Sequence, residues 1–343
     1  MNVLKRLIAG GMCAAMIALC ACQGAAPSGA EALPAPTDTA APAETAEDIN
    51  VMVLNGTTGF GMANLIYAAE AGEAAQSYSF SVETDAANIT AALINGSADI
   101  AALPTNAAAA VYNKTGGAVQ ALALNTRGVL YLVTDGSVDV TELASLRGMT
   151  VYAPAQNPSF ILQYLCQANG LTVGEDIFID NSFAQPADLN AALCSGEVSV
   201  AVLPEPMVTI ACMTNEALSV ALDLTAEWDT VAPAGSLVQG CVVVRREFAE
   251  ARSEAVKLFL EEYRASIDAL EADVQGSAEK IEHTGVFAKA AVAAKAIPNC
   301  NLCFIAGGDM SAALADFYEI MFAVAPESIG GAIPGEDFYY IGE

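Results

Sequence analysis

The sequence predicts an α/β protein with two lobes, because one helix–turn–strand pattern occurs twice, one hundred residues apart. Ala91–Pro104 and Ala191–Pro204 have the same residue at seven of fourteen positions. Each copy closes a helix at a glycine, Gly96 or Gly196, which tolerates the positive φ of a helix C-terminus. Each copy then continues into a short apolar run that stops at a proline, as buried parallel strands do. We therefore expect two lobes that arose by duplication.

The residues around each copy extend the match to two β-α-β-α-β units. In the first unit we expect strands Val51–Leu54, Ser79–Glu83 and Asp99–Leu103 and helices Phe60–Ala71 and Ala86–Asn95. In the second we expect strands Thr150–Ala153, Ile177–Asn181 and Ser199–Leu203 and helices Phe160–Asn169 and Pro186–Cys194, after a linker helix Val138–Leu146. A helix and a strand then follow each unit, at 106–113 and 119–124 and again at 207–214 and 220–224.

The chain is expected to cross between the lobes twice, at the apolar strands Gly128–Val133 and Gly240–Arg245. The last hundred residues are predicted to be helical, since Val256, Phe259 and Tyr263 begin a long amphipathic stripe. These expectations assign residues 48–128 and 241–343 to the first lobe and residues 129–240 to the second.

Residues 1–22 have the features of an export signal. Lys5 and Arg6 precede the apolar run Leu7–Leu19, which is shorter than the ~20 residues of a membrane span. The segment ends in Leu-Cys-Ala-Cys, which resembles a bacterial lipobox, so we expect lipidation of Cys22 at the mature N-terminus. Cys20 is less suited because the large Leu19 precedes it. Plain cleavage with free secretion is the alternative.

Residues 23–47 are predicted to be a disordered tether. They are rich in Ala, Pro, Thr and Glu and contain no aromatic residue. Such a composition cannot bury enough apolar surface to offset the entropy of ordering, and prolines bias it toward extended conformations. The segment would hold a folded domain away from a membrane surface.

The net charge narrows the choice of partners. The precursor carries −27, and removal of the signal leaves 11 Lys and Arg against 40 Asp and Glu, a formal charge of −29. This charge argues against nucleic acid, whose phosphates need cations, and against an anionic lipid surface. It fits a protein kept soluble outside the cytoplasm.

The sequence has few residues suited to catalysis or metal binding. The one histidine, His283, lies in a predicted C-terminal helix, where an exposed position is the simpler interpretation. No nucleophile elbow, zinc-protease motif or phosphate-binding loop occurs. Cys300 and Cys303 have C-x-x-C spacing without a second pair or a nearby histidine, so a disulfide or two free thiols are the options rather than zinc. We expect no catalytic residue, metal or cofactor.

Four loops at equivalent places in the two units are the candidate site. In open α/β sheets, ligands bind at the carboxyl ends of the strands, and helix N-termini there offer free N–H groups. Two facing lobes would bring the four loops to one cleft. The residues of these loops that we expect to bind a ligand are Thr57, Thr58, Gly59, Thr105, Asn106, Gln156, Asn157, Ser159 and Glu205.

These features together resemble the substrate-binding lipoproteins of ABC importers, in the nitrate/sulfonate/taurine and thiamine-precursor-like group. The resemblance covers nearly all of residues 48–343 and is carried by the lipobox, the tether and the runs L-N-G-T-T-G-F-G-M-A at 54–63, A-D-I-A-A-L-P-T-N at 98–106, G-V-L-Y-L-V at 128–133 and V-A-V-L-P-E-P at 200–206. It implies a type II periplasmic-binding-protein fold that closes on a small solute. It also implies a monomer, lipid-anchored outside the cell membrane, that works with a permease and an ATPase.

The ligand itself stays open at this point. Arg127 is the one cation near a crossing and would form a structural salt bridge or bind an anion, whereas Glu205 would suit an amine or N–H donor, or cap the helix that follows. Trp228 would stack on a planar ligand or pack in the core. The balance favours a small polar heterocycle or amine over sulfonate or nitrate. A solute-sensing lipoprotein and a pyrimidine-synthase-like enzyme are the alternative functions.

Overall fold

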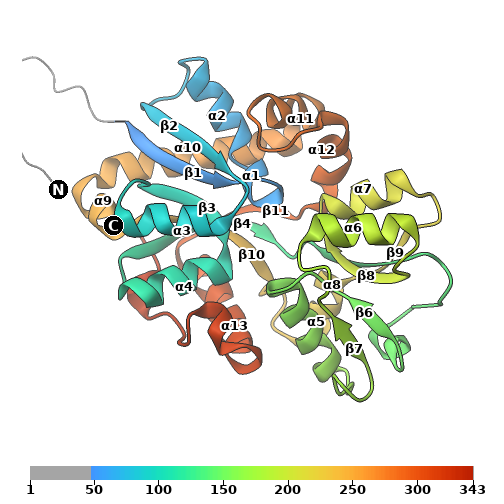
Figure 1. The fold of residues 1–343 in the computed structure, drawn as a ribbon. Helices are drawn as coiled ribbons and strands as arrows, with labels where there is room; N and C mark the ends of the chain where they lie inside the picture. The colour runs from blue at the N-terminus through green and yellow to red at the C-terminus, as the bar shows by residue number, and fades with distance from the viewer. Residues whose placement is uncertain (1–47, 343) are drawn as a thin grey trace, which may run out of the picture. The chain divides into compact units, whose positions relative to one another are not determined.

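The computed structural model describes residues 48–342, which form two β-sheets with helices on their faces (Figure 1). Cys22 and the expected tether lie outside the described residues. One sheet has six strands in the order β11-β4-β10-β3-β1-β2, and the other has five in the order β7-β6-β8-β5-β9. We call each sheet with the helices packed on it a lobe, the six-stranded one the first.

The strands of the first sheet are β1 Ile49–Leu54, β2 Tyr78–Glu83, β3 Ile100–Pro104, β4 Val119–Arg127, β10 Val238–Arg245 and β11 Leu302–Ala306. Those of the second are β5 Leu130–Thr134, β6 Thr150–Tyr152, β7 Phe178–Asp180, β8 Val200–Pro204 and β9 Ser219–Asp223.

The two sheets repeat one strand order. β1 pairs in parallel with β2 and β3, as β6 does with β7 and β8. In each sheet an antiparallel strand, β10 or β5, then lies between the third strand and the next one, β4 or β9. Register agrees as well, since Pro104 faces Gly240 of β10 and Pro204 faces Leu130 of β5. The α/β fold with two sheets of the same strand order is therefore confirmed. Each sheet contains one strand, β10 or β5, that the chain enters directly after a crossing between the lobes.

The crossings themselves are links between strands. The chain leaves the first sheet after Arg127 and enters β5 at Leu130; it returns between α8 (Leu224–Val231) and β10, which begins at Val238. Gly128 lies in the first link, where a Cβ would be 2.2 Å from Thr225 Oγ1. A side chain at this position would therefore collide with α8, so the close approach requires glycine.

The helices cover both faces of each sheet (Figure 1). The helices that lie between β1 and β4 in the chain are α1 Thr57–Phe60, α2 Ala63–Glu70, α3 Ala86–Asn95 and α4 Thr105–Thr115. The second sheet has the 3-10 turn η1 Leu143–Leu146 and helices α5 Asn157–Ala168, α6 Pro186–Ser195, α7 Met207–Thr214 and α8. The C-terminal part contains α9 Arg246–Ala251, α10 Ser253–Ala272, α11 Val274–His283, α12 Ala290–Ala296, η2 Ile297–Asn299, α13 Gly307–Val324, η3 Pro326–Ile329 and η4 Glu336–Phe338.

Three sequence-based expectations for the elements were wrong. The expected helix 60–71 is divided into α1 and α2, because the turn at Gly61 approaches α10, where a Cβ would lie 2.9 Å from Ile267. The expected linker helix 138–146 is only the turn η1. The C-terminal part is not purely helical, since β11 pairs with β4 at the edge of the first sheet. The residues of β11 read Leu-Cys-Phe-Ile-Ala, an apolar run without alternation that periodicity cannot distinguish from a helix.

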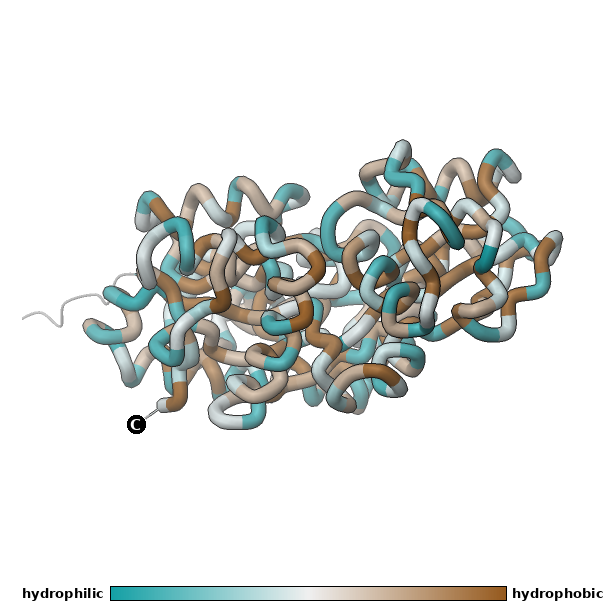
Figure 2. The backbone as a smooth tube through the Cα atoms, turned by 90° about the horizontal axis from the view of Figure 1, so that it is seen from below, coloured by the Kyte–Doolittle hydropathy of each residue, from teal (hydrophilic) through white to brown (hydrophobic). Residues whose placement is uncertain are grey.

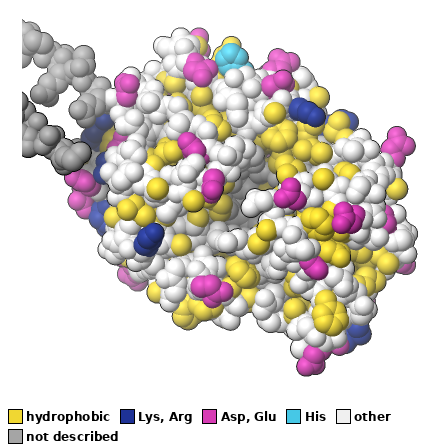
Figure 3. Space-filling model, in the orientation of Figure 1, with side chains coloured by type: hydrophobic (Ala, Val, Ile, Leu, Met, Phe, Trp, Pro, Cys, Tyr) yellow, Lys and Arg dark blue, Asp and Glu magenta, His cyan; other side chains and the backbone are white. Residues whose placement is uncertain are grey.

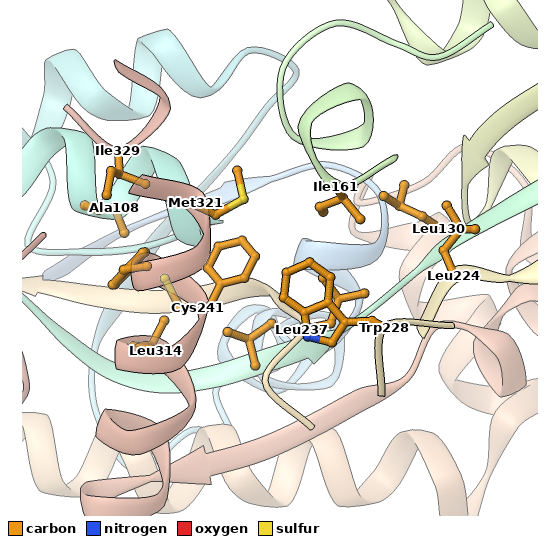
Figure 4. Close-up of a cluster of buried hydrophobic side chains, with 14 of the residues drawn as sticks. Ala108, Leu130, Ile161, Leu224, Trp228, Leu237, Cys241, Leu314, Met321 and Ile329 are labelled. Carbon is orange, nitrogen blue, oxygen red and sulfur yellow. The ribbon is translucent and has the colours of Figure 1, made fainter. Parts of the chain in front are cut away.

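The hydrophobic core joins the two lobes on one side. One cluster contains Cys241 of β10, Leu130 of β5, Trp228 of α8 and Met321 of α13, so it includes residues of both sheets and of α13 (Figure 4). Trp228 lies 4.8 Å from Tyr164 of α5 and 6.1 Å from Phe317 of α13, measured between ring centroids. The two other clusters each lie within one lobe. Figure 2 shows hydrophobic positions running through the interior of both lobes.

Candidate ligand-binding site

The four predicted loops meet where the lobes face each other. Thr57 Oγ1, after β1, donates a hydrogen bond of 2.6 Å to the carbonyl oxygen of Glu205, after β8. Asn157 Nδ2, after β6, donates one of 2.8 Å to Asn106 Oδ1, after β3. Each loop of one lobe thus contacts a loop of the other, which their separate positions in the sequence do not require.

The facing residues form a buried polar layer, which we define as Thr57, Thr105, Asn106, Asn157, Ser159 and Glu205. All six are at most 8% exposed. Thr58 is half-buried and Gln156 is exposed. Buried polar atoms need hydrogen-bond partners. Thr105 Oγ1 donates to the carbonyl oxygen of Val238 at 2.8 Å, and Ser159 Oγ donates to Asn181 Oδ1 at 3.3 Å.

One atom of the polar layer stands apart. Asn157 Oδ1 is buried and has no hydrogen-bond partner within residues 48–342. Its amide nitrogen is already used by Asn106, so the free atom is the acceptor. Leaving a buried acceptor unpaired costs about 1–3 kcal/mol, which makes it a place where a donor would bind.

Glu205 caps the helix that follows it. Its carboxylate accepts from Thr209 N at 3.1 Å and from Thr209 Oγ1 at 3.0 Å, in the first turn of α7. Burial raises the pKa of this carboxyl group above its usual value, although the two Thr209 bonds oppose that shift. Of the two roles that the sequence allows for Glu205, the capping role is thus visible in the structure.

Two of the helices that start in the layer have open N-termini. α4 begins at Thr105 and α5 at Asn157, and neither receives a side-chain cap. The first N–H groups of a helix have no partner within it, and together they carry partial positive charge. These ends can donate hydrogen bonds to an acceptor placed between the lobes.

The residues before α1 and α5 share an unusual backbone conformation. Gly56 has φ 82° and ψ −156°, and Gln156, one hundred residues later, has φ 73° and ψ −136°. This region is nearly restricted to glycine, so Gln156 is strained there. The turn that presents α5 is therefore a copy of the one that presents α1.

Gly59 and its neighbour have structural contacts. A Cβ on Gly59 would lie 2.4 Å from the carbonyl oxygen of Leu54, so glycine is required for packing. The carbonyl oxygen of Thr58 accepts from Asn125 Nδ2 at 3.2 Å. Asn125 is fully buried at the end of β4 and was missed from the sequence. The signal was an asparagine directly after the apolar run Ala121–Leu124.

Arg127 is not brought together with the four loops. Its side chain is exposed and lines a separate cavity of about 330 Å³ with Ser236, Ile305, Asp309 and Asp316. That cavity contains none of the residues of the polar layer. Arg127 instead lies beside the first crossing, close to Gly235 of the second link.

The C-terminal segment adds residues that were not expected in the site from the sequence. Cys300 Sγ lies 3.9 Å from Thr57 Oγ1, and Tyr131 OH donates to the carbonyl oxygen of Asn299 at 2.8 Å. Burial raises the pKa of the Cys300 thiol and of the Tyr131 hydroxyl, and the nearby Glu205 raises both further. Cys300 and Cys303 are free thiols. This segment is hard to recognise from the sequence, because the predicted helices around it contain no motif typical of a binding site.

His283 and Trp228 lie away from the layer. His283 is exposed at the end of α11 and pairs with Glu70 of α2 at 3.3 Å. Trp228 is fully buried, and its Nε1 donates to Ser236 Oγ at 2.8 Å.

Within residues 48–342, no group of three or more His, Cys, Asp or Glu is arranged to hold a metal ion. No helix in this range is both long and apolar enough for a membrane span.

Comparison with known proteins identifies the fold. No family model and no curated protein matches the sequence significantly. An ABC transporter structure from Parabacteroides distasonis matches with a TM-score of 0.73 and 23% identity over 85% of this chain and 98% of that one. The periplasmic aliphatic sulphonate binding protein SsuA of Escherichia coli matches with 0.68 and 15% over 87% and 93%. A Candida albicans protein described as having the generic periplasmic binding protein fold matches with 0.56 and 13% over 85% and 93%.

The chain therefore has the periplasmic-binding-protein fold, and its structural neighbours include ABC transporter binding proteins, among them sulfonate-binding SsuA proteins.

Proposed function

We propose that this protein captures a small polar solute between its lobes and delivers it to an ABC permease driven by an ATPase. The observation that supports this most directly is the polar layer, in which the loop after the first strand of each lobe meets the loop after the third strand of the other, through the Thr57–Glu205 and Asn157–Asn106 hydrogen bonds. A solute held there would be enclosed by both lobes at once.

The proposed mechanism is a closure about the two crossings. When the lobes separate, the Thr57–Glu205 and Asn157–Asn106 hydrogen bonds break and the polar layer meets water. A solute that contacts both lobes binds the closed state more tightly, so it shifts the population toward closure. We assign polar contacts with the solute to Thr57, Thr58, Thr105, Asn106, Gln156, Asn157, Ser159 and Glu205, and a place at the hinge to Arg127.

The remaining features fit delivery at a membrane. In this proposal Cys22 carries the lipid, residues 23–47 span the distance to the membrane, and the monomer works outside the cell membrane without a cofactor. Acidic side chains are spread over both lobes on the face that Figure 3 shows, and Lys and Arg are few there. A surface with few cations does not bind anionic lipid, so it adds no membrane attachment beyond the lipid on Cys22.

The test is to find the solute. Native mass spectrometry of the purified protein, before and after unfolding, should release one small molecule in stoichiometric amount. Adding that molecule back should raise Tm and make the small-angle scattering profile more compact. Asn157→Ala should lose the response, whereas Asn88→Ala, an exposed asparagine on α3, should keep it.

Two outcomes would contradict the proposal. If neither a released molecule nor any compound of a metabolite panel changes Tm or the scattering profile, solute capture is wrong. If the purified protein converts the solute without a transporter, the enzyme alternative is right instead. Neighbouring genes for a kinase receptor, rather than for a permease and an ATPase, would favour the sensor alternative.

A further inference from the structure

We infer that the solute is uncharged and presents an N–H donor next to a hydrogen-bond acceptor, as an amide or a lactam does. This inference rests on the proposed function, because it names the ligand class of the polar layer. It differs from the sulfonates named for some structural neighbours.

The donor is required by Asn157. This residue is 8% exposed, and its Oδ1 has no partner within the described part of the chain. Its Nδ2 is held by Asn106 of the opposite lobe, which fixes the side chain and leaves the carbonyl oxygen as the atom to be satisfied. Only a ligand atom that carries a hydrogen can pair with it; a sulfonate, nitrate or carboxylate oxygen would be repelled.

The acceptor is favoured by the helix ends beside the same residue. Asn157 is the first residue of α5, and its hydrogen bond reaches Asn106 in the first turn of α4. Neither helix has a side-chain cap, so their first N–H groups are available to a ligand carbonyl. A donor and an acceptor side by side on one ligand would use both Asn157 Oδ1 and these N–H groups.

A full negative charge on the ligand has no counterpart in the layer. No Lys or Arg is buried among residues 48–342, and Arg127 faces a separate cavity. An enclosed anion would have only partial helix charges to compensate its desolvation. An enclosed cation would have to compete with Thr209, from which both oxygens of the Glu205 carboxylate already accept hydrogen bonds. An uncharged solute avoids both costs.

The experiment compares matched small probes of different charge. Propionamide and uracil form the uncharged arm, propionate, ethanesulfonate and orotate the anionic arm, and propylamine the cationic arm. Each is tested with the full chain by thermal shift and titration calorimetry. Any compound released from the purified protein is identified in parallel by mass spectrometry. We expect the uncharged arm alone to raise Tm and the released compound to carry an amide-like group.

Variants locate the effect. Asn157→Ala should weaken binding of the uncharged arm by about tenfold or more, as expected for loss of a buried hydrogen bond. Asn88→Ala should leave it unchanged. If Asn157→Ala does not fold, the identity of the released compound still decides the question.

The outcomes separate this inference from the proposed function. A response to the anionic or cationic arm alone, or release of a permanently charged compound, overturns the ligand class and keeps solute capture. Equal loss of binding in Asn88→Ala would also overturn the role of Asn157. No response in any arm, together with no released compound, overturns both.

Discussion

The two lobes have the same strand order but differ at the strand ends that face each other. After β3, Thr105 Oγ1 donates to the carbonyl oxygen of Val238, the first residue of β10, so it joins the loop to the returning crossing. After β8, the equivalent Glu205 accepts from α7. The turn before the first helix is Gly56 in one lobe and Gln156 in the other, with nearly the same backbone angles. The backbone is thus alike at these tips while the side chains differ.

The two sides of the lobe interface also differ. On one side α13 packs Phe317 against Trp228, and the apolar core is continuous between the lobes. On the other side the contacts are the hydrogen bonds of the polar layer. Apolar burial stabilises without direction, whereas a polar layer can exchange its bonds with water or a solute. The polar side is therefore the one able to open.

The largest expected effect comes from a substitution on the apolar side of the lobe interface. Phe317→Ala should lower the free energy of unfolding by about 3–5 kcal/mol, the usual cost of removing a fully buried aromatic ring. Urea denaturation followed by tryptophan fluorescence measures it, since Trp228 is adjacent. Phe178→Ala, a ring 51% exposed on β7, is the control and should cost less than about 1 kcal/mol. Similar losses in both variants would refute the packing described here.

The crossing is the next most sensitive point. Gly128→Ala should destabilise by about 1–3 kcal/mol, because its Cβ would lie 2.2 Å from Thr225 Oγ1 and 2.7 Å from Leu237 Cδ2. Gly308→Ala, where a Cβ would meet nothing within 4 Å, should be nearly neutral. Differential scanning calorimetry of both variants provides the comparison. A neutral Gly128→Ala would mean that the link is looser than its contacts indicate.

Exchanging the residues at positions 56 and 156 tests whether the two turns are equivalent in energy. Gly56→Gln should destabilise by about 1–3 kcal/mol, because Gln would have to adopt a glycine-only conformation although space is open around Gly56. Gln156→Gly should stabilise by roughly 1 kcal/mol, the relieved strain less the added chain entropy of glycine. Chemical denaturation of the two variants should therefore give opposite signs. The same sign for both would show that the turns are not equivalent in energy.

The smallest expected effect concerns the pH dependence of stability. Burial raises the pKa of Glu205 in the folded protein, so the folded state holds this proton more tightly than the unfolded chain does. Its contribution to stability is present at low pH and decreases as pH rises through the folded pKa.

Glu205→Gln cannot titrate, so Tm should fall less steeply than in the parent as pH rises above the ordinary carboxyl range. The difference in the free energy of unfolding between Glu205→Gln and the parent should be about 1 kcal/mol or less. The substitution also alters one Thr209 hydrogen bond, which has an effect of similar size. Thr105→Val, at the equivalent position, removes no titrating group and should leave the pH slope unchanged. An unaltered slope in Glu205→Gln would show that this carboxyl group does not contribute to it.

Much of the fold was predictable because its signals are local. The repeat around Gly96 and Gly196 indicated the duplicated strands, and the apolar strands ending at Pro104 and Pro204 occur in equivalent positions of the two sheets. The split of α1 from α2 and the edge strand β11 were missed because both depend on distant partners, Ile267 on α10 and β4 respectively. Such contacts leave no period in the sequence.

For the candidate site, the sequence by itself determined which residue types stand at the four strand ends and that no Lys or Arg is among them. Only the tertiary structure decided which of them face each other: that Thr57 meets Glu205, that Asn157 meets Asn106, and that Arg127 faces another cavity. The physical reason is that a loop's chemistry is local, whereas burial and an unpaired atom such as Asn157 Oδ1 arise only when two distant segments exclude water together.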